Sequence, residues 1–351
     1  MTDPVDFAAL IPNGSKYAVR VMETRLSMPA QTRELEPGLL CLAGLPIELP
    51  ASWAEWRGAR ELDRMRKCSL VLLAVAPSAD PEVYDRENRA LEDRLQRYHG
   101  GLSICTPGYE VAFGRTIGGA RRGGYLDARS SGEVVPYWPT SGTPRNWVIT
   151  ARHLGSAVAV GEALNAIRAT MSQKADRLTR ILYAFHLGLS SNVWDVRLHQ
   201  FCRVLDGLAA TDVGSGRRQF GDRCCRMICD RAQVHREFFN SAYDTRGAIE
   251  HLRGPIDVIR AAVPEVKTDD EAYLYVAYAA FALEQVARHA LLHVCNTPAL
   301  WPHMRDSTKA RALWADAAGF AAALWREPLD LSAIQGSFDR SSAESTILLS
   351  S

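Results

Sequence analysis

Residues 242–254 read AYDTRGAIEHLRG, and this stretch places Arg246 five positions ahead of His251. The two residue types suit phosphate chemistry, because a guanidinium stabilises charge on a phosphoryl oxygen and an imidazole transfers protons near neutral pH. Spacing alone does not establish a site, because 41 basic residues, nearly all arginine, and nine histidines produce such a pair by chance. The same spacing recurs as Arg94 with His99 in RLQRYH. The sequence around each pair must therefore decide between them.

The sequence around Arg246 has a helical pattern. From Thr150 onward, apolar residues recur every three or four positions, as on a helix that buries one face. Thr268 followed by Glu271 predicts a capping box at the start of a long helix, and Gly254-Pro255 marks a helix stop. Helical segments are expected at 178–189, 193–210, from about 217, and at 271–295.

The first part of the chain has a different pattern. It mixes short apolar runs with Gly and Pro, which is typical of strands joined by turns. Strands are expected at YAVRVM (17–22) and GEVVPYW (132–138), and one helix is expected at 81–100. The predicted organisation is an α+β domain over residues 1–149, an all-α helical bundle over 150–330 and a flexible, Ser-rich tail over 331–351.

A Gly- and Arg-rich stretch, GRTIGGARRGGY (114–125), lies inside the first domain. It lacks the Gly-Lys-Ser/Thr ending of a phosphate-binding P-loop. A β-hairpin with exposed arginines is the favoured interpretation. The alternative is a weak RNA-binding surface formed by Arg115, Arg121 and Arg122, which would lead RNA toward the helical domain.

The composition restricts the classes of function. A net charge of +1 gives no global field for nucleic acid or an anionic membrane, so such a partner must be held by a local patch. The longest apolar run, at 70–76, is far shorter than the roughly 20 residues of a membrane span. The N-terminus lacks the basic and apolar regions of a secretory signal. We therefore expect a cytoplasmic protein without a membrane partner.

The cysteines do not indicate a metal site. All eight are expected to be buried thiols in a reducing compartment, and Cys224, Cys225 and Cys229 with His235 lack the paired C-x-x-C spacing of zinc ligands.

The bias toward arginine over lysine suits phosphate contact, although high genomic GC content gives the same bias without any function. No metal and no cofactor are predicted.

The segment YDTRGAIEHLRG is preceded by RLHQFCRVLDGL and QFGDRCCRMI and followed by a long helical run containing LEQVARHALL. Together these residues, about 190–300, resemble the HEPN superfamily (higher eukaryotes and prokaryotes nucleotide-binding). Its ribonuclease members carry an Arg-x4-6-His motif on a helical bundle. The Arg94 and His99 pair lies outside this region, so the resemblance favours Arg246 and His251 as the site.

The resemblance implies a metal-independent endoribonuclease that uses the 2′-hydroxyl of RNA as the nucleophile. Such domains form homodimers in which two Arg/His pairs converge on one RNA cleft. By this resemblance Arg246 would hold the scissile phosphate and His251 would transfer protons. The implied setting is phage defence or toxin-like growth arrest. The first domain would then sense a phage trigger or a regulatory partner protein, or restrain the nuclease.

Three carboxylates are candidates for supporting the pair. Asp206 occupies the place where many HEPN proteins have an acidic residue in an early helix, and it would orient Arg246. Asp244 is a second possible partner of that arginine, and Glu250 beside the histidine would favour imidazolium by its charge. Two residues five apart on one ideal helix point about 140° apart. A composite site between two subunits, or a helix start or kink near Gly247, would accommodate this angle.

Two alternatives to a nuclease stay open. The position after the arginine is commonly polar in the family, and Gly247 lacks a side chain that would help to bind phosphate. The superfamily also contains catalytically silent members. In that case the bundle would be a binding or dimerisation module, with Arg246 paired to Asp206 or Asp244 and His251 capping a helix C-terminus. The other alternative is an unrelated helical bundle.

Overall fold

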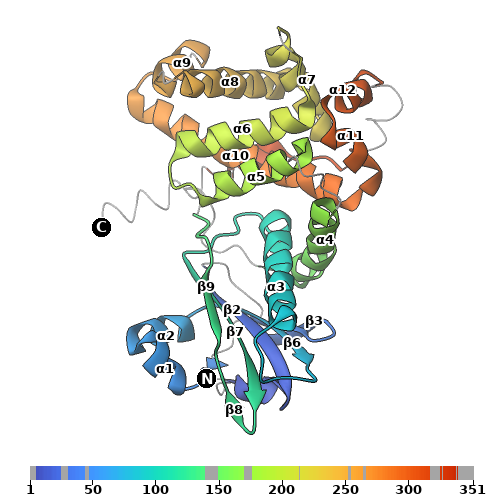
Figure 1. Cartoon of the computed structure of the whole chain (residues 1–351). Helices are drawn as coiled ribbons and strands as arrows, with labels where there is room; N and C mark the ends of the chain where they lie inside the picture. Colours follow the sequence, from blue (N-terminus) through green and yellow to red (C-terminus); the bar gives the residue numbers. More distant parts are fainter. Residues whose placement is uncertain are drawn as a thin grey trace. The chain divides into compact units, whose positions relative to one another are not determined.

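The computed structural model describes residues 5–24, 31–43, 47–138, 149–169, 176–212, 214–251, 254–263, 266–316, 325, 327–336 and 338. Two compact units are present (Figure 1). The division falls within helix α4 (Ala151–Ala169), because its residues through Glu162 group with the first unit. It therefore lies slightly later than the predicted boundary after residue 149. The first unit contains an antiparallel sheet and the second is helical, in agreement with the predicted α+β region followed by a helical region.

The centre of the first unit is an antiparallel sheet. Within the described residues its paired order is β3 (Gln31–Glu36), β4 (Leu39–Ala43), β6 (Leu70–Pro77), β2 (Ser15–Glu23) and β7 (Phe113–Arg122), with β8 (Tyr125–Leu126) and β9 (Ser130–Glu133) both beside β7. A separate parallel pair joins β1 (Val5–Asp6) to β5 (Ile47–Glu48).

Both faces of the central strands are buried. Alternate residues of β2, including Tyr17 and Val19, join an apolar cluster with Trp53 of α1 (Ser52–Arg57) and Leu62 of α2 (Ala59–Arg66). On the opposite face of β2, the buried Arg20 donates a hydrogen bond from Nε to Thr116. This alternation follows from the two-residue repeat of a strand. The sheet is therefore the core of the first unit.

The predicted strand at 17–22 lies within β2, whereas two other predictions need adjustment. The helix expected at 81–100 is α3 (Arg86–Cys105), because Asp85 caps its first turn. The expected strand at 132–138 is β9 followed by one isolated bridge at Tyr137. Pro136 has no amide proton with which to continue a ladder between them.

The predicted hairpin at 114–125 is confirmed by the pairing of β7 with β8. Gly123 and Gly124 form its turn with φ angles of 50° and 90°, which lie in the left-handed region that favours glycine. In α3, Gly101 permits a close approach to α4, because a Cβ at this position would overlap the carbonyl oxygen of Ala157.

Helices make up the second unit, and those expected from apolar spacing are confirmed. The predicted capping box is present, with Thr268 and Glu271 each bonded to the other's backbone N–H. No described helix is both long and apolar enough to cross a membrane. The helices after α4 are α5 (Arg177–Ser190), α6 (Trp194–Ala209), α7 (Gly216–Met227), α8 (Gln233–Glu250), α9 (Pro255–Ala262), α10 (Asp269–Asn296), α11 (Trp301–Arg305) and α12 (Ser307–Ala315).

Helix α6 occupies the middle of the second unit, between α5, α10 and α8 (Figure 1). Its buried Arg197 donates from Nη2 to Glu284 of α10 at 2.6 Å, and Arg288 donates to the same carboxylate at 2.7 Å. A buried charged group is stable only when it is paired and hydrogen-bonded. This triad therefore fixes how α6 faces α10.

The prediction of a flexible tail from residue 331 is wrong for its first residues. Residues 331–336 are helical, Leu331 is buried, and Ile334 and Phe338 pack against Phe281 of α10. These three apolar side chains recur at helical spacing, which accounts for their burial. Residues 339–351 of the predicted tail lie outside the described residues.

Candidate functional site

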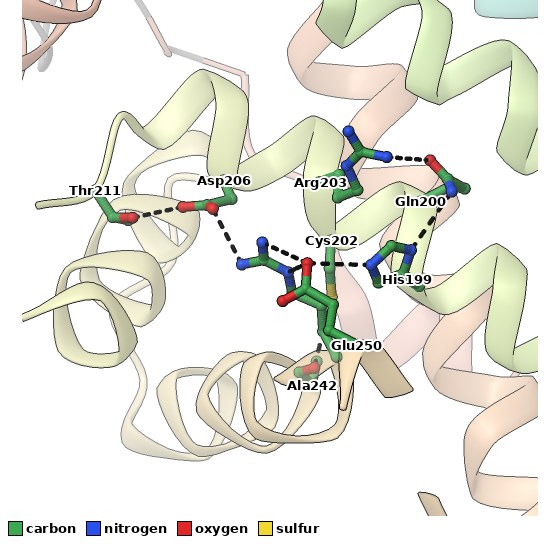
Figure 2. A network of polar contacts seen from close by, with 9 residues as sticks. His199, Gln200, Cys202, Arg203, Asp206, Thr211, Ala242 and Glu250 are labelled. Carbon is green, nitrogen blue, oxygen red and sulfur yellow. Dashed lines mark hydrogen bonds and ion pairs between the residues drawn. The ribbon is translucent and has the colours of Figure 1, made fainter. Parts of the chain in front are cut away.

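Two of the three predicted carboxylates contact Arg246 of α8. Its Nη1 donates to Oδ2 of Asp206 in α6 at 3.1 Å. Its Nε and Nη2 donate to Oε1 of Glu250, one turn later in α8, at 3.2 and 3.0 Å. Figure 2 shows Asp206 and Glu250 in this network of polar contacts. The arginine side chain is 17% exposed, so the network lies at the edge of the helical core.

The structure adds His199 to this network. Its Nε2 lies 3.2 Å from Oε1 of Glu250, the same oxygen that accepts from Arg246 (Figure 2). Sequence reasoning missed this histidine. A signal was present, because His199, Arg203 and Asp206 are spaced by four and three residues and therefore share one face of α6.

The network keeps both of its central groups charged. Burial lowers the pKa of Arg246, but the carboxylates of Asp206 and Glu250 outweigh this effect and raise it above the ordinary value. Burial raises the pKa of Glu250, but Arg246 and the hydrogen bond with His199 hold it below the ordinary value. The guanidinium also lies over the ring of Tyr243, 5.4 Å from its centroid. The side chain of Arg246 is therefore positively charged and held in place by its two carboxylate partners.

His251 is not brought into this network. It follows the last residue of α8, where its backbone N–H donates to the carbonyl oxygens of Gly247 and Ala248. Its side chain is exposed and makes no hydrogen bond or ion pair with another side chain among the described residues. Helix α8 begins at Gln233, which excludes a helix start near Gly247. Within one chain, no hydrogen bond or ion pair among the described residues joins Arg246 to His251.

Asp244 does not support Arg246. Its Oδ2 accepts a hydrogen bond at 2.8 Å from Nε of Arg217 in α7. That pair joins α7 to α8 at an exposed position. Asp244 does not reach Arg246, because residues two apart on a helix do not face each other.

The three arginines of the first unit are held by intramolecular contacts. Arg115 pairs with Glu61 of α2 at 2.7 Å, and Arg122 pairs with Glu82, which precedes α3. Arg121 donates to two backbone carbonyls near the N-terminus. The expectation of exposed arginines holds for Arg122, whose side chain is 41% exposed, but not for Arg115, whose side chain is 15% exposed. These contacts compete with the weak RNA-binding role predicted for them.

A cavity of about 290 Å³ opens beside Arg246. We call it the arginine cavity, because five of its lining residues are arginines and only one is acidic. Helices α5, α6, α8 and α12 contribute to its walls. A concave site with converging charged groups is the usual form of a ligand site. Its lining residues are Arg177, Arg180, Ile181, Ala184, Arg203, Asp206, Gly207, Ala210, Thr211, Arg246, Ser307 and Arg311.

The cysteine cluster considered from sequence lies on α7 and in the turn that follows it. Cys224 and Cys225 are buried in α7, and burial raises the pKa of the Cys225 thiol to about 11. Cys229 is exposed, so the expectation that all eight cysteines are buried is wrong at this position. Its Sγ donates to the carbonyl of Trp325, and His235 lies 3.0 Å from Asp230. Among the described residues, no three His, Cys, Asp or Glu side chains are grouped to hold a metal ion.

Comparison with known proteins found no match to any family model, curated protein or solved structure. The function is therefore inferred from the residues of this site.

Proposed function

We propose that the helical unit is a metal-independent endoribonuclease of HEPN type that cleaves RNA beside Arg246. One observation carries the proposal. Arg246, the arginine singled out in the sequence, lines a cavity to which four further arginines contribute. Guanidinium groups bind phosphate through a planar set of donors, and RNA carries one phosphate per nucleotide. Such a cavity suits the backbone of RNA.

In this proposal the 2′-oxygen attacks the neighbouring phosphorus and the bond from phosphorus to the 5′-oxygen breaks. The products are a 2′,3′-cyclic phosphate and a 5′-hydroxyl. Arg246 stabilises the charge that develops on the phosphoryl oxygens, while Asp206 and Glu250 position its guanidinium. His251 transfers protons from its exposed position after α8, and a second copy of the chain completes the site.

The proposed biological setting is phage defence or toxin-like growth arrest, with the first unit responding to a trigger or a partner. Expression of the full chain is then expected to slow bacterial growth. The full chain carrying Arg246→Gln is expected to be tolerated at equal protein level. Equal growth inhibition by both chains would contradict the proposed setting.

A second candidate function is phosphate binding without cleavage. Two observations favour it, because Arg246 is already engaged by two carboxylates and His251 lies outside the arginine cavity. Gly247 adds no polar group beside the arginine. In this candidate the helical unit holds a phosphorylated partner, and no bond breaks.

Cleavage of a labelled single-stranded RNA in EDTA distinguishes the two candidates. The full chain is compared with Arg246→Gln, His251→Ala and His199→Ala, each checked by circular dichroism. Arg218→Gln is the matched control, because Arg218 is exposed on α7 and does not line the cavity. We expect cyclic-phosphate ends from wild type and the control, and at least a hundredfold slower cleavage by Arg246→Gln and His251→Ala, the range of a lost acid, base or charge-stabilising group.

RNA binding without cleavage by wild type would favour the second candidate. Loss of cleavage in His199→Ala but not in His251→Ala would move the proton-transfer role to the histidine that contacts Glu250.

A further inference from the structure

The arginine cavity holds more positive charge than its carboxylates balance. Arg177, Arg180 and Arg203 form no ion pair with any described carboxylate. Arg311 pairs with Asp212 at 3.0 Å, and Arg246 takes Asp206 and Glu250. Five arginines thus face three paired carboxylates, and the charge of Asp306 also acts on Arg177. This leaves an excess of about one to two positive charges, because arginine stays protonated in proteins.

Arg177 shows most clearly that an acceptor is missing. Its Nη2 donates to the carbonyl of Gly207, whereas its Nη1 is buried with no hydrogen-bond partner among the described atoms. Burial lowers the pKa of Arg177 to about 10, and the charges of Arg311 and Arg180 lower it further, while those of Asp206 and Asp306 oppose this shift. A buried donor without an acceptor costs free energy that a bound anion would recover.

Two helices begin at the cavity wall. Arg177 is the first residue of α5 and Ser307 is the first residue of α12, and a helix N-terminus carries partial positive charge. Asp176 accepts the backbone N–H of Thr179 and Asp306 accepts that of Lys309, so each first turn already has one donor capped by a carboxylate. The arginine side chains are therefore the groups that would hold an anion.

We propose that the arginine cavity binds a phosphomonoester, the terminal phosphate of a nucleotide. A phosphomonoester carries about 1.5 to 2 negative charges near neutral pH, so it balances the excess more fully than the single charge of an internal phosphodiester, which the cavity also accommodates. The cavity volume of about 290 Å³ is at the lower end of small-ligand sites and suits one nucleotide. The phosphate would come from a free mononucleotide or from a phosphorylated RNA end. This binding goes beyond the proposed cleavage and does not require it.

Isothermal titration calorimetry of the full chain at pH 7.5 tests the proposal with two matched ligand pairs. The first pair is AMP and adenosine. The second is a 2′-O-methylated octanucleotide with a 5′-phosphate and the same oligonucleotide with a 5′-hydroxyl. Methylation blocks attack by the 2′-oxygen, so only binding is measured. We expect at least tenfold tighter binding of the phosphorylated member in one pair, and that pair identifies the source of the phosphate.

The protein variants locate the binding. The exposed Arg180 and Arg203 line the cavity, so the double variant Arg180→Gln with Arg203→Gln is expected to lose at least tenfold in affinity for the phosphorylated ligand. Arg218→Gln makes the same chemical change outside the cavity and is expected to bind like wild type.

Equal affinity within both ligand pairs would overturn the proposal, as would equal losses in the Arg218→Gln control and the double variant. Failure of the proposed nuclease is recognised separately. In that case phosphomonoester binding persists while the chain leaves unmodified RNA uncut.

Discussion

Gly247 lies in the interior of α8, and a Cβ added there would meet no atom within 4 Å. Glycine in a helix interior destabilises by roughly 0.5–1 kcal/mol relative to alanine. Gly247→Ala is therefore expected to raise the free energy of unfolding by about that amount in urea denaturation. The contrasting control is Gly188→Ala, where a Cβ would lie 2.8 Å from the ring of Phe201 and should destabilise. A loss of stability in Gly247→Ala would contradict the described backbone of α8.

Glu250 competes with phosphate for Arg246 while it also positions that arginine. Glu250→Gln is expected to tighten binding of the uncleavable octanucleotide several-fold, because one negative charge leaves the site. Cleavage of unmodified RNA should slow, because the guanidinium loses its strongest restraint on α8. Fluorescence anisotropy and gel assays measure the two effects, with the exposed Glu237→Gln of α8 as control. Weaker binding in Glu250→Gln would show that the carboxylate assists phosphate binding.

The contact between α6 and α10 depends on one buried carboxylate. Glu284 accepts from both Arg197 and Arg288, and all three side chains are nearly inaccessible. Glu284→Gln removes the carboxylate that accepts from both buried guanidinium groups, and breaking a buried ion pair in this way costs about 3–5 kcal/mol. Urea denaturation followed by circular dichroism measures this loss.

The control for this variant is Thr268→Ala at the start of α10. Thr268 caps the helix at an exposed position, and loss of such a cap costs about 1 kcal/mol. If Glu284→Gln were no more destabilising than Thr268→Ala, the triad would not fix the packing of α6 against α10.

For the molecule as a whole, partly buried histidines predict a loss of stability in acid. Burial lowers the pKa of His186 to about 4, and burial also lowers the pKa of His289 and His293. In the unfolded chain these groups bind protons near pH 6.5, whereas the folded chain resists protonation. The unfolded state therefore binds more protons below pH 6.5, and stability falls as the pH decreases from about 6.5 to about 4.

Urea denaturation at pH 7.5, 6.0 and 5.0 measures this dependence. His186→Gln is expected to reduce the change in unfolding free energy across that range, since its side chain does not titrate there. An unchanged pH dependence in His186→Gln would assign the effect to other groups.

Much of the helical unit follows from local signals. The capping box at Thr268, Pro255 at the start of α9 and the apolar spacing of α5 and α6 each act within one or two turns. The sheet of the first unit is less predictable. β6 pairs with β4 and β2, and these pairings join residues far apart in the chain with no local sequence signal. For the same reason, the sequence of residues 70–76 does not by itself indicate that they lie in β6, a central strand of the sheet.

The residues of the candidate site also fall into two groups, those that the sequence predicted and those that only the structure revealed. Arg246, Asp206 and Glu250 were found from the sequence, because a short motif and one early helix contain them. His199, Arg177, Arg180 and Arg311 were not found, because they reach the site only when α5, α6 and α12 pack together. The chain alone specifies helices and their charged faces through local periodicity. The packing of the helices decides which faces meet, and therefore which arginines line one cavity. The sequence does not show this, because contacts between distant segments produce no periodic pattern of residues.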